Sequence, residues 1–265
     1  MEIEMAQHAE VGTWTLVDLP VGKNVVGCWW GRMWWAAGGE ERGGLLVGKN
    51  VVDCQWVYAA KTDAKGNFEL SKARLVAQGF TQRPSMDYFN ATSLVVKLDS
   101  LQLILAIAIQ KGWEIEMMDV KGAYLNSTLD EEIYMRQPDS FDDKSGRVLK
   151  LHQAIYSLKQ SGHSWYKKLM TVLFNDGFTQ SHADDCVFYK KIGDRLSIIT
   201  IYVDNLSLFA STKALMVSIK TLLHSNFTMK DLGEMLKILG IRVKIDRHRN
   251  FIKLLQGHYI DVIVQ

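Results

Sequence analysis

The chain has 265 residues, of which 48% are hydrophobic and 23% charged, and its formal net charge is +2 at neutral pH. This composition is typical of a globular protein and excludes an intrinsically disordered chain. The longest apolar run, residues 101–109, is too short for a membrane span, which needs roughly 20 residues. Because acids stand at the N-terminus where a signal peptide carries bases, we expect an intracellular protein, cytoplasmic or nuclear, without a membrane partner.

Charge is distributed unevenly along the chain. Residues 211–265 contain nine Lys/Arg and four Asp/Glu, so the rest of the chain carries a net charge of −3. A basic segment beside a more acidic body suits a protein that binds phosphates with one part and metal ions with another. A solvated basic surface without a partner explains the charge equally well.

A ten-residue segment occurs twice near the N-terminus. VGKNVVGCWW at residues 21–30 returns as VGKNVVDCQW at residues 47–56, with eight of ten positions identical. Each copy is rich in strand formers and predicts one short β-strand. The sequence between them contains Gly pairs and a Trp pair without a period, as in an insertion. We expect only the second copy to hold a regular place in a sheet, with residues 51–58 pairing with the strand through Leu75.

The rest of the chain predicts alternating strands and helices. A β-hairpin is expected from strands at residues 56–62 and 68–80, with Gly66 supplying a positive φ in the turn. Because strands adjacent in sequence can pair as hairpins, the expected fold class is α+β with an antiparallel sheet. Further strands are predicted at residues 113–120, 133–135, 148–151, 186–190, 195–209, 236–245 and 251–255, and helices at 96–111, 164–175 and 213–225.

Two aspartates stand at strand ends. Asp119 closes an apolar strand, and Asp204 is followed by Asn205 in the middle of a hydrophobic run, where a hairpin turn is expected. A carboxylate inside a sheet is costly, so Asp204 must lie at the turn or bind a cation. If the two strands are neighbours, the carboxylates converge and suit a pair of Mg²⁺ ions roughly 3.5–4 Å apart. By spacing alone, an ordinary polar turn is the simpler interpretation.

Nine short motifs stand in order along the chain. They are TWTLVDLP (13–20), KARLVAQGFTQ (72–82), MDVKGAYLN (118–126), IYMRQP (133–138), AIYSLKQSG (154–162), WYKKL (165–169), CVFY (186–189), YVDN (202–205) and MKDLGE (229–234). YVDN is similar to the Y-x-D-D hairpin of reverse transcriptases, and the other eight follow the order of the copia-type family. The chain therefore resembles the reverse transcriptase of copia-type LTR retrotransposon polyproteins.

The resemblance implies a right-hand polymerase with fingers, a palm built on an antiparallel sheet, and a partial thumb. This domain is expected over residues 51–265, after a degenerate N-terminal segment at residues 1–50. The implied activity is RNA-directed DNA synthesis, with nucleotidyl transfer from dNTPs by two Mg²⁺ ions. The implied partners are an RNA or DNA template with its primer.

Residue roles carry over only where a motif matches. Asp119, Asp204 and Asn205 correspond to the catalytic carboxylates, and metal ligands are expected from Asp119, the carbonyl of Val120 and Asp204. The nucleotide-binding residues implied by the family are Lys72, Arg74, Tyr124 and Gln160. The hairpin that holds the primer end is expected at Leu239, Gly240 and Ile241. Asp184 and Asp185 fall outside the motif, and we interpret them as a turn that enters the next strand.

Three positions depart from the family pattern. Asn205 replaces an aspartate, Ser157 stands where glycine is usual, and Leu94 stands where proline is usual. If position 157 needs φ > 0, the serine strains the loop that carries Gln160. Two hypotheses follow, an enzyme impaired at Asn205 and an inactive relic that at most binds nucleic acid. A third hypothesis is a structural protein recruited by the host, but no feature of the sequence supports it.

Overall fold

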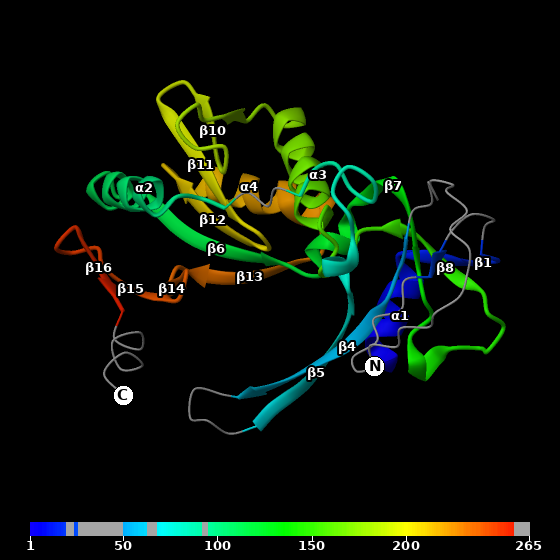
Figure 1. Ribbon diagram of the computed structural model, residues 1–265. Helices are drawn as coiled ribbons and strands as arrows, with labels where there is room; N and C mark the ends of the chain where they lie inside the picture. The colour runs from blue at the N-terminus through cyan, green and yellow to red at the C-terminus, as the bar shows by residue number, and fades with distance from the viewer. Residues whose placement is uncertain (20–23, 26–49, 63–67, 92–94, 257–265) are drawn as a thin grey trace. The chain divides into compact units, whose positions relative to one another are not determined.

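A computed structural model of the protein describes residues 1–19, 24–25, 50–62, 68–91 and 95–256. The chain forms two compact units (Figure 1). The first contains Met1–Thr92 and Tyr124–Trp165, and the second contains Ser93–Ala123 and Tyr166–Gln265. Within the described ranges, no helix is both long enough and apolar enough to cross a membrane.

The first unit contains a five-stranded sheet in the order β1-β8-β7-β3-β2 and the helix α1 (Glu2–Glu10). The chain thus crosses between strands that are distant in sequence. A core of Val52, Leu75, Met135 and Ile155, each at most 1% exposed, packs beneath the sheet. The strands are β1 (Trp14–Val17), β2 (Asn24–Val25), β3 (Asn50–Val52), β7 (Thr128–Met135) and β8 (Val148–Gln153).

The predicted hairpin forms from β4 (Cys54–Thr62) and β5 (Phe68–Ala77), which Figure 1 shows as a long two-stranded ribbon. Trp56 lies opposite Leu75, so the expected pairing is confirmed from residue 54 onward. It is wrong for Val51 and Val52, which pair with β7 in parallel. Both valines are at most 1% exposed, so burial in the core of the five-stranded sheet decides their place.

The two described residues of the first repeat copy pair with the second copy. Asn24 lies opposite Asn50 and Val25 opposite Val51 in a parallel ladder, so each residue faces its own equivalent in the other copy. The expectation that only one copy enters a sheet was therefore wrong. Identical residues have identical strand propensity, and a parallel pair needs a long connection, which the inserted sequence supplies. Residues 26–49, which include the Trp pair, lie outside the described residues.

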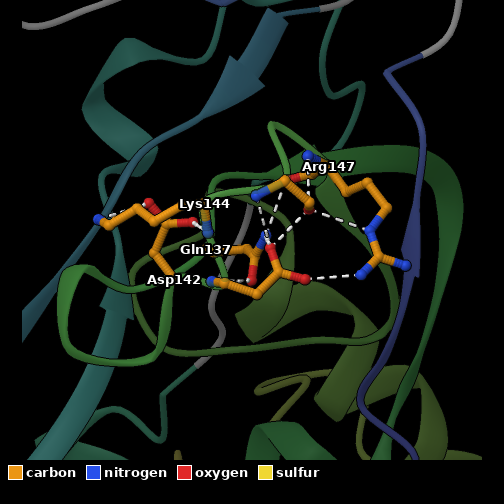
Figure 2. Close-up of polar contacts among 6 residues, drawn as sticks. Gln137, Asp142, Lys144 and Arg147 are labelled. Atoms are coloured by element: carbon orange, nitrogen blue, oxygen red, sulfur yellow. Dashed lines mark hydrogen bonds and ion pairs between the residues drawn. The ribbon is translucent and has the colours of Figure 1, made fainter.

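A polar loop joins β7 to β8 (Figure 2). The Asp143 carboxylate accepts hydrogen bonds from Gln137 Nε2 (2.8 Å), from the backbone N–H (3.0 Å) and hydroxyl of Ser145, and from Arg147 Nη2 (2.6 Å). The Ser145 hydroxyl is the leading cause that holds the pKa of Asp143 well below its usual range. Hydrogen bonds to one carboxylate thus order this exposed connection.

The second unit is built on a six-stranded antiparallel sheet in the order β13-β6-β12-β11-β10-β9. Its core includes Ile115, Phe188, Leu208 and Phe209, all fully buried. The predicted antiparallel α+β class is confirmed for this sheet. The strands are β6 (Glu114–Val120), β9 (Thr179–Gln180), β10 (Val187–Ile192), β11 (Arg195–Tyr202), β12 (Asn205–Ala210) and β13 (Met229–Glu234).

Helices and a small sheet complete this unit. Helix α2 (Leu98–Gln110) packs against β16 (Phe251–Leu255), and α4 (Lys213–Asn226) packs against β12. Helix α3 (Ser161–Asn175) crosses the boundary between the units. The predicted strand at 236–245 is two strands, β14 (Lys237–Ile238) and β15 (Ile241–Asp246), which form a three-stranded sheet with β16.

Ser157 adopts φ = +69°, the left-handed conformation that glycine tolerates best. Its carbonyl approaches Gly79 so closely that a Cβ on Gly79 would lie 1.9 Å from the oxygen. The Ala77 N–H also donates to the carbonyl of Tyr156 (2.9 Å). These contacts hold the serine in its left-handed conformation, so the condition under which the sequence analysis expects strain is met.

Replacing Ser157 with glycine is therefore expected to raise the free energy of unfolding by about 1 kcal/mol, because it removes the left-handed strain. Ser218→Gly, in the exposed middle of α4, is the matched control and is expected to lower that free energy by roughly 0.5 kcal/mol. Urea unfolding of the three proteins measures both changes. A destabilised Ser157→Gly protein would show that φ at this position is not strained.

His8 is a buried titratable group in α1. It is 1% exposed, its ring lies 4.7 Å from the ring of Trp14, and its Nδ1 lies 3.1 Å from Thr13 Oγ1. Burial lowers the pKa of His8 to about 4, although Glu4 Oε1 lies 3.8 Å from Nε2. In the folded protein His8 binds a proton only near pH 4, whereas in the unfolded chain it binds one near pH 6.5.

This depressed pKa makes the protein sensitive to acid. The stability that neutral His8 provides is complete above pH 6.5, and up to about 3 kcal/mol is lost as the pH falls towards 4. His8→Gln is expected to flatten the fall in melting temperature between pH 6.5 and 4. The exposed His182→Gln serves as control and should keep the wild-type slope. Identical slopes in wild type and His8→Gln would contradict this assignment.

Candidate active site

The neighbouring strands β6 and β12 bring the predicted acidic residues to one end of the sheet. Asp119 lies directly opposite Asn205 in the antiparallel register. Tyr202 pairs with Asn205 and leaves Val203 and Asp204 as a two-residue turn. The backbone N–H of Val120 donates to the carbonyl of Asp204 (2.8 Å), which ties the turn to the end of β6. The sequence condition that these two strands be neighbours is thus met.

The turn itself is strained. Val203 has φ = +56°, and a β-branched residue in the left-handed region is a genuine outlier. Such strain, of order 1–3 kcal/mol, persists only where surrounding contacts over-determine the conformation, and it clusters at functional sites. Here the hairpin register and the Val120–Asp204 hydrogen bond impose it. These contacts therefore fix the backbone of Asp204 relative to the sheet.

Asn205 changes the electrostatics of the turn. Its Nδ2 donates a hydrogen bond to Oδ1 of Asp204 (2.9 Å). An aspartate at this position would instead place a second carboxylate beside Asp204, and the pair would need a cation. The amide thus occupies an oxygen that would otherwise be open to a metal ion.

A lysine that sequence reasoning missed lies beside this site. Lys230 on β13 is directly opposite Asp119 on β6, on the side away from Asn205. Opposite charges across neighbouring strands attract, so Lys230 lowers the net negative charge at Asp119. We did not predict β13 as a strand, although its residues belong to the MKDLGE motif.

The residues present fit a divalent cation only in part. Asp119 and Asp204 supply the carboxylate oxygens that Mg²⁺ prefers. Over the described ranges, no group of three or more His, Cys, Asp and Glu side chains is suitably placed to hold a metal ion. The donor set at the turn is thus two carboxylates and an amide that already donates to one of them.

In the first unit, Tyr156 connects two of the predicted nucleotide-binding residues. The Arg74 guanidinium carbon lies 5.5 Å from the centre of the Tyr156 ring, and Tyr124 packs edge-on to the same ring at 5.0 Å. Arg74 Nε is buried without a hydrogen-bond partner among the described residues. A buried guanidinium N–H that lacks an acceptor suits an anionic ligand. Tyr156 had no assigned role in the sequence, although it lies within AIYSLKQSG.

Lys72 and Arg74 both lie on β5, and α1 contacts this strand at Leu75. The Leu75 N–H donates to Glu4 Oε1 (3.4 Å). Burial raises the pKa of Glu4, and this hydrogen bond together with the positive charges of Lys72 and Arg74 opposes the shift. The N-terminal helix therefore places a carboxylate beside the two predicted phosphate-binding cations.

Gln160 is held inside the first unit. It is 1% exposed, its Oε1 accepts from Gln82 Nε2 (3.1 Å), and its Nε2 donates to the Asp87 carbonyl (3.4 Å). Gln82 also accepts from the Lys159 N–H (2.9 Å). These bonds fix the loop that follows strained Ser157.

The remaining predicted positions are backbone features. Leu239 (φ = +53°) and Gly240 (φ = +78°) form the two-residue turn between β14 and β15, and Ile241 begins β15. Two positive φ angles in succession are typical of a type I′ hairpin turn.

Asp184 accepts hydrogen bonds from the N–H groups of Lys97 (2.9 Å) and Cys186 (3.0 Å), which confirms its interpretation as a structural turn before β10.

Comparison with known proteins gives a consistent result. Residues 46–265 match the family described as "Reverse transcriptase (RNA-dependent DNA polymerase)". The chain is 32% identical over 268 residues to a retrovirus-related Pol polyprotein from transposon TNT 1-94 of Nicotiana tabacum, covering 100% of this chain and 18% of the polyprotein. It is 35% identical over 192 residues to the retrovirus-related Pol polyprotein from transposon RE1 of Arabidopsis thaliana, and this match covers 72% of this chain and 13% of the polyprotein. The chain thus spans less than a fifth of the length of either relative.

The geometry of the turn predicts how divalent cations respond to Asn205. Asn205→Asp is expected to tighten Mg²⁺ binding roughly tenfold or more, because it adds a carboxylate and removes the hydrogen bond to Asp204. Asn175→Asp, at the exposed end of α3, adds the same charge elsewhere and is expected to change nothing. Isothermal titration calorimetry compares the three proteins. Equal affinities in both variants would place the cation away from this turn.

Proposed function

Because this chain belongs to the reverse transcriptase (RNA-dependent DNA polymerase) family, we propose that it is a template-primed DNA polymerase whose chemistry is impaired at Asn205. Its substrates are dNTPs, and its partners are an RNA or DNA template with a primer. The relatives' printed names, Pol polyproteins of plant transposons, support a copia-type retrotransposon origin. The polymerase domain is residues 51–265, after a degenerate segment at residues 1–50, and a family match that begins at residue 46 supports this division.

The palm sheet of this polymerase is the six-stranded sheet of the second unit. Asp119 and Asp204, with the Val120 carbonyl, are the groups that would hold Mg²⁺. When bound, two such ions stabilise the charge that develops on the transferring phosphoryl group. The register that places Asp119 beside the Val203–Asp204 turn supports this assignment.

The nucleotide is bound by residues of the fingers. Arg74 suits a triphosphate because its planar fork donates two parallel hydrogen bonds, and Lys72 adds a point charge. Tyr124 lies against the sugar, and Gln160, which is 1% exposed, supports the site of the new base pair through the loop that it fixes. The partnerless Arg74 Nε and the packing of Tyr124 on Tyr156 support these roles. Leu239, Gly240 and Ile241 form the turn that holds the primer end.

The observation that carries the impairment is the hydrogen bond from Asn205 to Asp204. An amide lacks the negative charge that attracts Mg²⁺. At about 4 Å and an effective dielectric constant near 20, each pair of unit charges is worth roughly 4 kcal/mol. Rearrangement of water and Asp204 reduces this loss, but even about 3 kcal/mol corresponds to roughly a hundredfold in rate.

The same hydrogen bond favours a second candidate function. A turn that satisfies its own carboxylate is stable without a metal ion. In this second candidate, the protein is an inactive relic that binds nucleic acid. Phosphate contacts come from Lys and Arg, and they survive the loss of the metal site.

Primer extension on an RNA template at saturating Mg²⁺ separates the two candidates. Asn205→Asp is expected to raise the extension rate roughly a hundredfold, and adding Asp204→Asn is expected to abolish it. Equal, measurable rates in wild type and Asn205→Asp would refute the impairment. No extension by either protein, with duplex binding intact, would identify the chain as the inactive nucleic-acid-binding relic.

A further inference from the structure

The first turn of α1 places an acid beside the cations of β5. Glu4 Oε1 accepts a hydrogen bond from the Leu75 N–H (3.4 Å), and the Glu4 side chain is only 11% exposed. Burial raises the pKa of Glu4, whereas the Leu75 N–H lowers it. The positive charges of Lys72 and Arg74 lower this pKa as well, so both cations act on the carboxylate. A carboxylate taken out of water needs such compensation, and Glu4 is therefore a counter-charge to the cations of this strand.

The histidine of the same helix does not balance Glu4. His8 Nε2 lies 3.8 Å from Glu4 Oε1, but burial lowers the pKa of His8 to about 4, so the imidazole is neutral at pH 7. Arg74, for its part, keeps a buried Nε that has no hydrogen-bond partner among the described residues. The charges at this strand are thus compensated while the hydrogen bonds of Arg74 remain incomplete. An anion with several oxygens satisfies this guanidinium better than Glu4 does.

The contacts of the first turn are weak. The hydrogen bond from β5 (3.4 Å) is longer than the usual N–H···O distance of about 2.9–3.0 Å. The hydroxyl of Tyr58 donates to Met1 Sδ (3.3 Å), a poor acceptor, and Ile3 is 87% exposed. In contrast, Met5 packs against the core of the first unit, and His8 is 1% exposed. The first turn can therefore leave β5 while the rest of the helix stays docked.

We propose that the first turn of α1 is an autoinhibitory element, in which Glu4 competes with the triphosphate of a nucleotide for Lys72 and Arg74. A triphosphate brings several negative charges to the strand that Glu4 contacts, so the two anions repel each other there. Docking of Glu4 and binding of the triphosphate therefore weaken each other by the same factor. The inference rests on the proposed function, in which β5 binds the incoming nucleotide, but it does not depend on Asp204 and Asn205.

Isothermal titration calorimetry with inorganic tripolyphosphate tests the competition. EDTA is present, so that a metal ion makes no contribution. Glu4→Gln removes the charge but keeps an oxygen that accepts from the Leu75 N–H, and it is expected to tighten binding about tenfold, within the usual coupling between two sites. Glu10→Gln removes the same charge from an exposed position of α1 and is expected to keep the wild-type affinity. Arg74→Gln is expected to weaken binding about tenfold or more.

Hydrogen exchange of the Leu75 amide supplies the reciprocal readout. Tripolyphosphate is expected to speed this exchange in the wild-type protein, because it displaces the carboxylate that accepts from the amide. In Glu4→Gln the added anion is expected to leave the rate unchanged, since the side chain has no charge to be repelled. A purely structural role of Glu4 would not make the exchange of Leu75 respond to an anion. The wild-type measurement also decides if a variant fails to fold, because an unchanged rate at saturating tripolyphosphate would refute the competition.

The variants separate this inference from the proposed function. Equal affinities in wild type and Glu4→Gln, with weaker binding by Arg74→Gln, would refute the autoinhibition and leave β5 as the nucleotide site. Weaker binding by Glu4→Gln would show that the carboxylate orients the cations instead of competing with the anion. Binding that neither Glu4→Gln nor Arg74→Gln changes would refute both the autoinhibition and the proposed nucleotide site. Titration with dTTP is expected to give the same order of affinities, and an effect of Glu4→Gln on tripolyphosphate alone would exclude competition with the nucleotide.

Discussion

The antiparallel pairing of β6 with β12 is the constraint on which the candidate active site depends. It places Asp119 opposite Asn205 and leaves only Val203 and Asp204 to close the hairpin. A two-residue turn in this register requires a positive φ at Val203, an unfavourable conformation for a β-branched residue. The ladder on both sides and the Val120–Asp204 hydrogen bond outweigh this strain. The sheet thus fixes the backbone of Asp204 before any ligand arrives.

Asn205 differs from an aspartate by an amide nitrogen in place of one carboxylate oxygen, and this difference decides how strongly the turn can bind a cation. A carboxylate in its place would put two negative charges side by side, and a cation would be needed to balance them. The amide instead donates a hydrogen bond to the Asp204 carboxylate. The amide thus changes the charge of the turn, while the register of the hairpin that carries it is formed by the backbone. Ser157 shows a different departure, because its strained φ affects the loop that carries Gln160 and leaves the charge of the site unchanged.

The duplicated N-terminal segment shows how a sheet absorbs additional sequence. The second copy enters the core through Val51 and Val52 and continues into β4, and the first copy adds a strand at the sheet edge through Asn24 and Val25. An edge strand offers unpaired N–H and C=O groups, so a copy of the adjacent sequence pairs there without disturbing the core.

The sequence by itself determined the family, the antiparallel α+β class and most of the strands and helices, because hydrophobic periodicity and ordered motifs are local properties. It also indicated the turn at Asp204 and the strain at Ser157, since both follow from residue types that conflict with their positions. Only the tertiary structure revealed Lys230 opposite Asp119, Tyr156 between Arg74 and Tyr124, and the pairing of the repeat copies. Each of these depends on register between segments far apart in the chain, and no local pattern encodes which strand lies beside which.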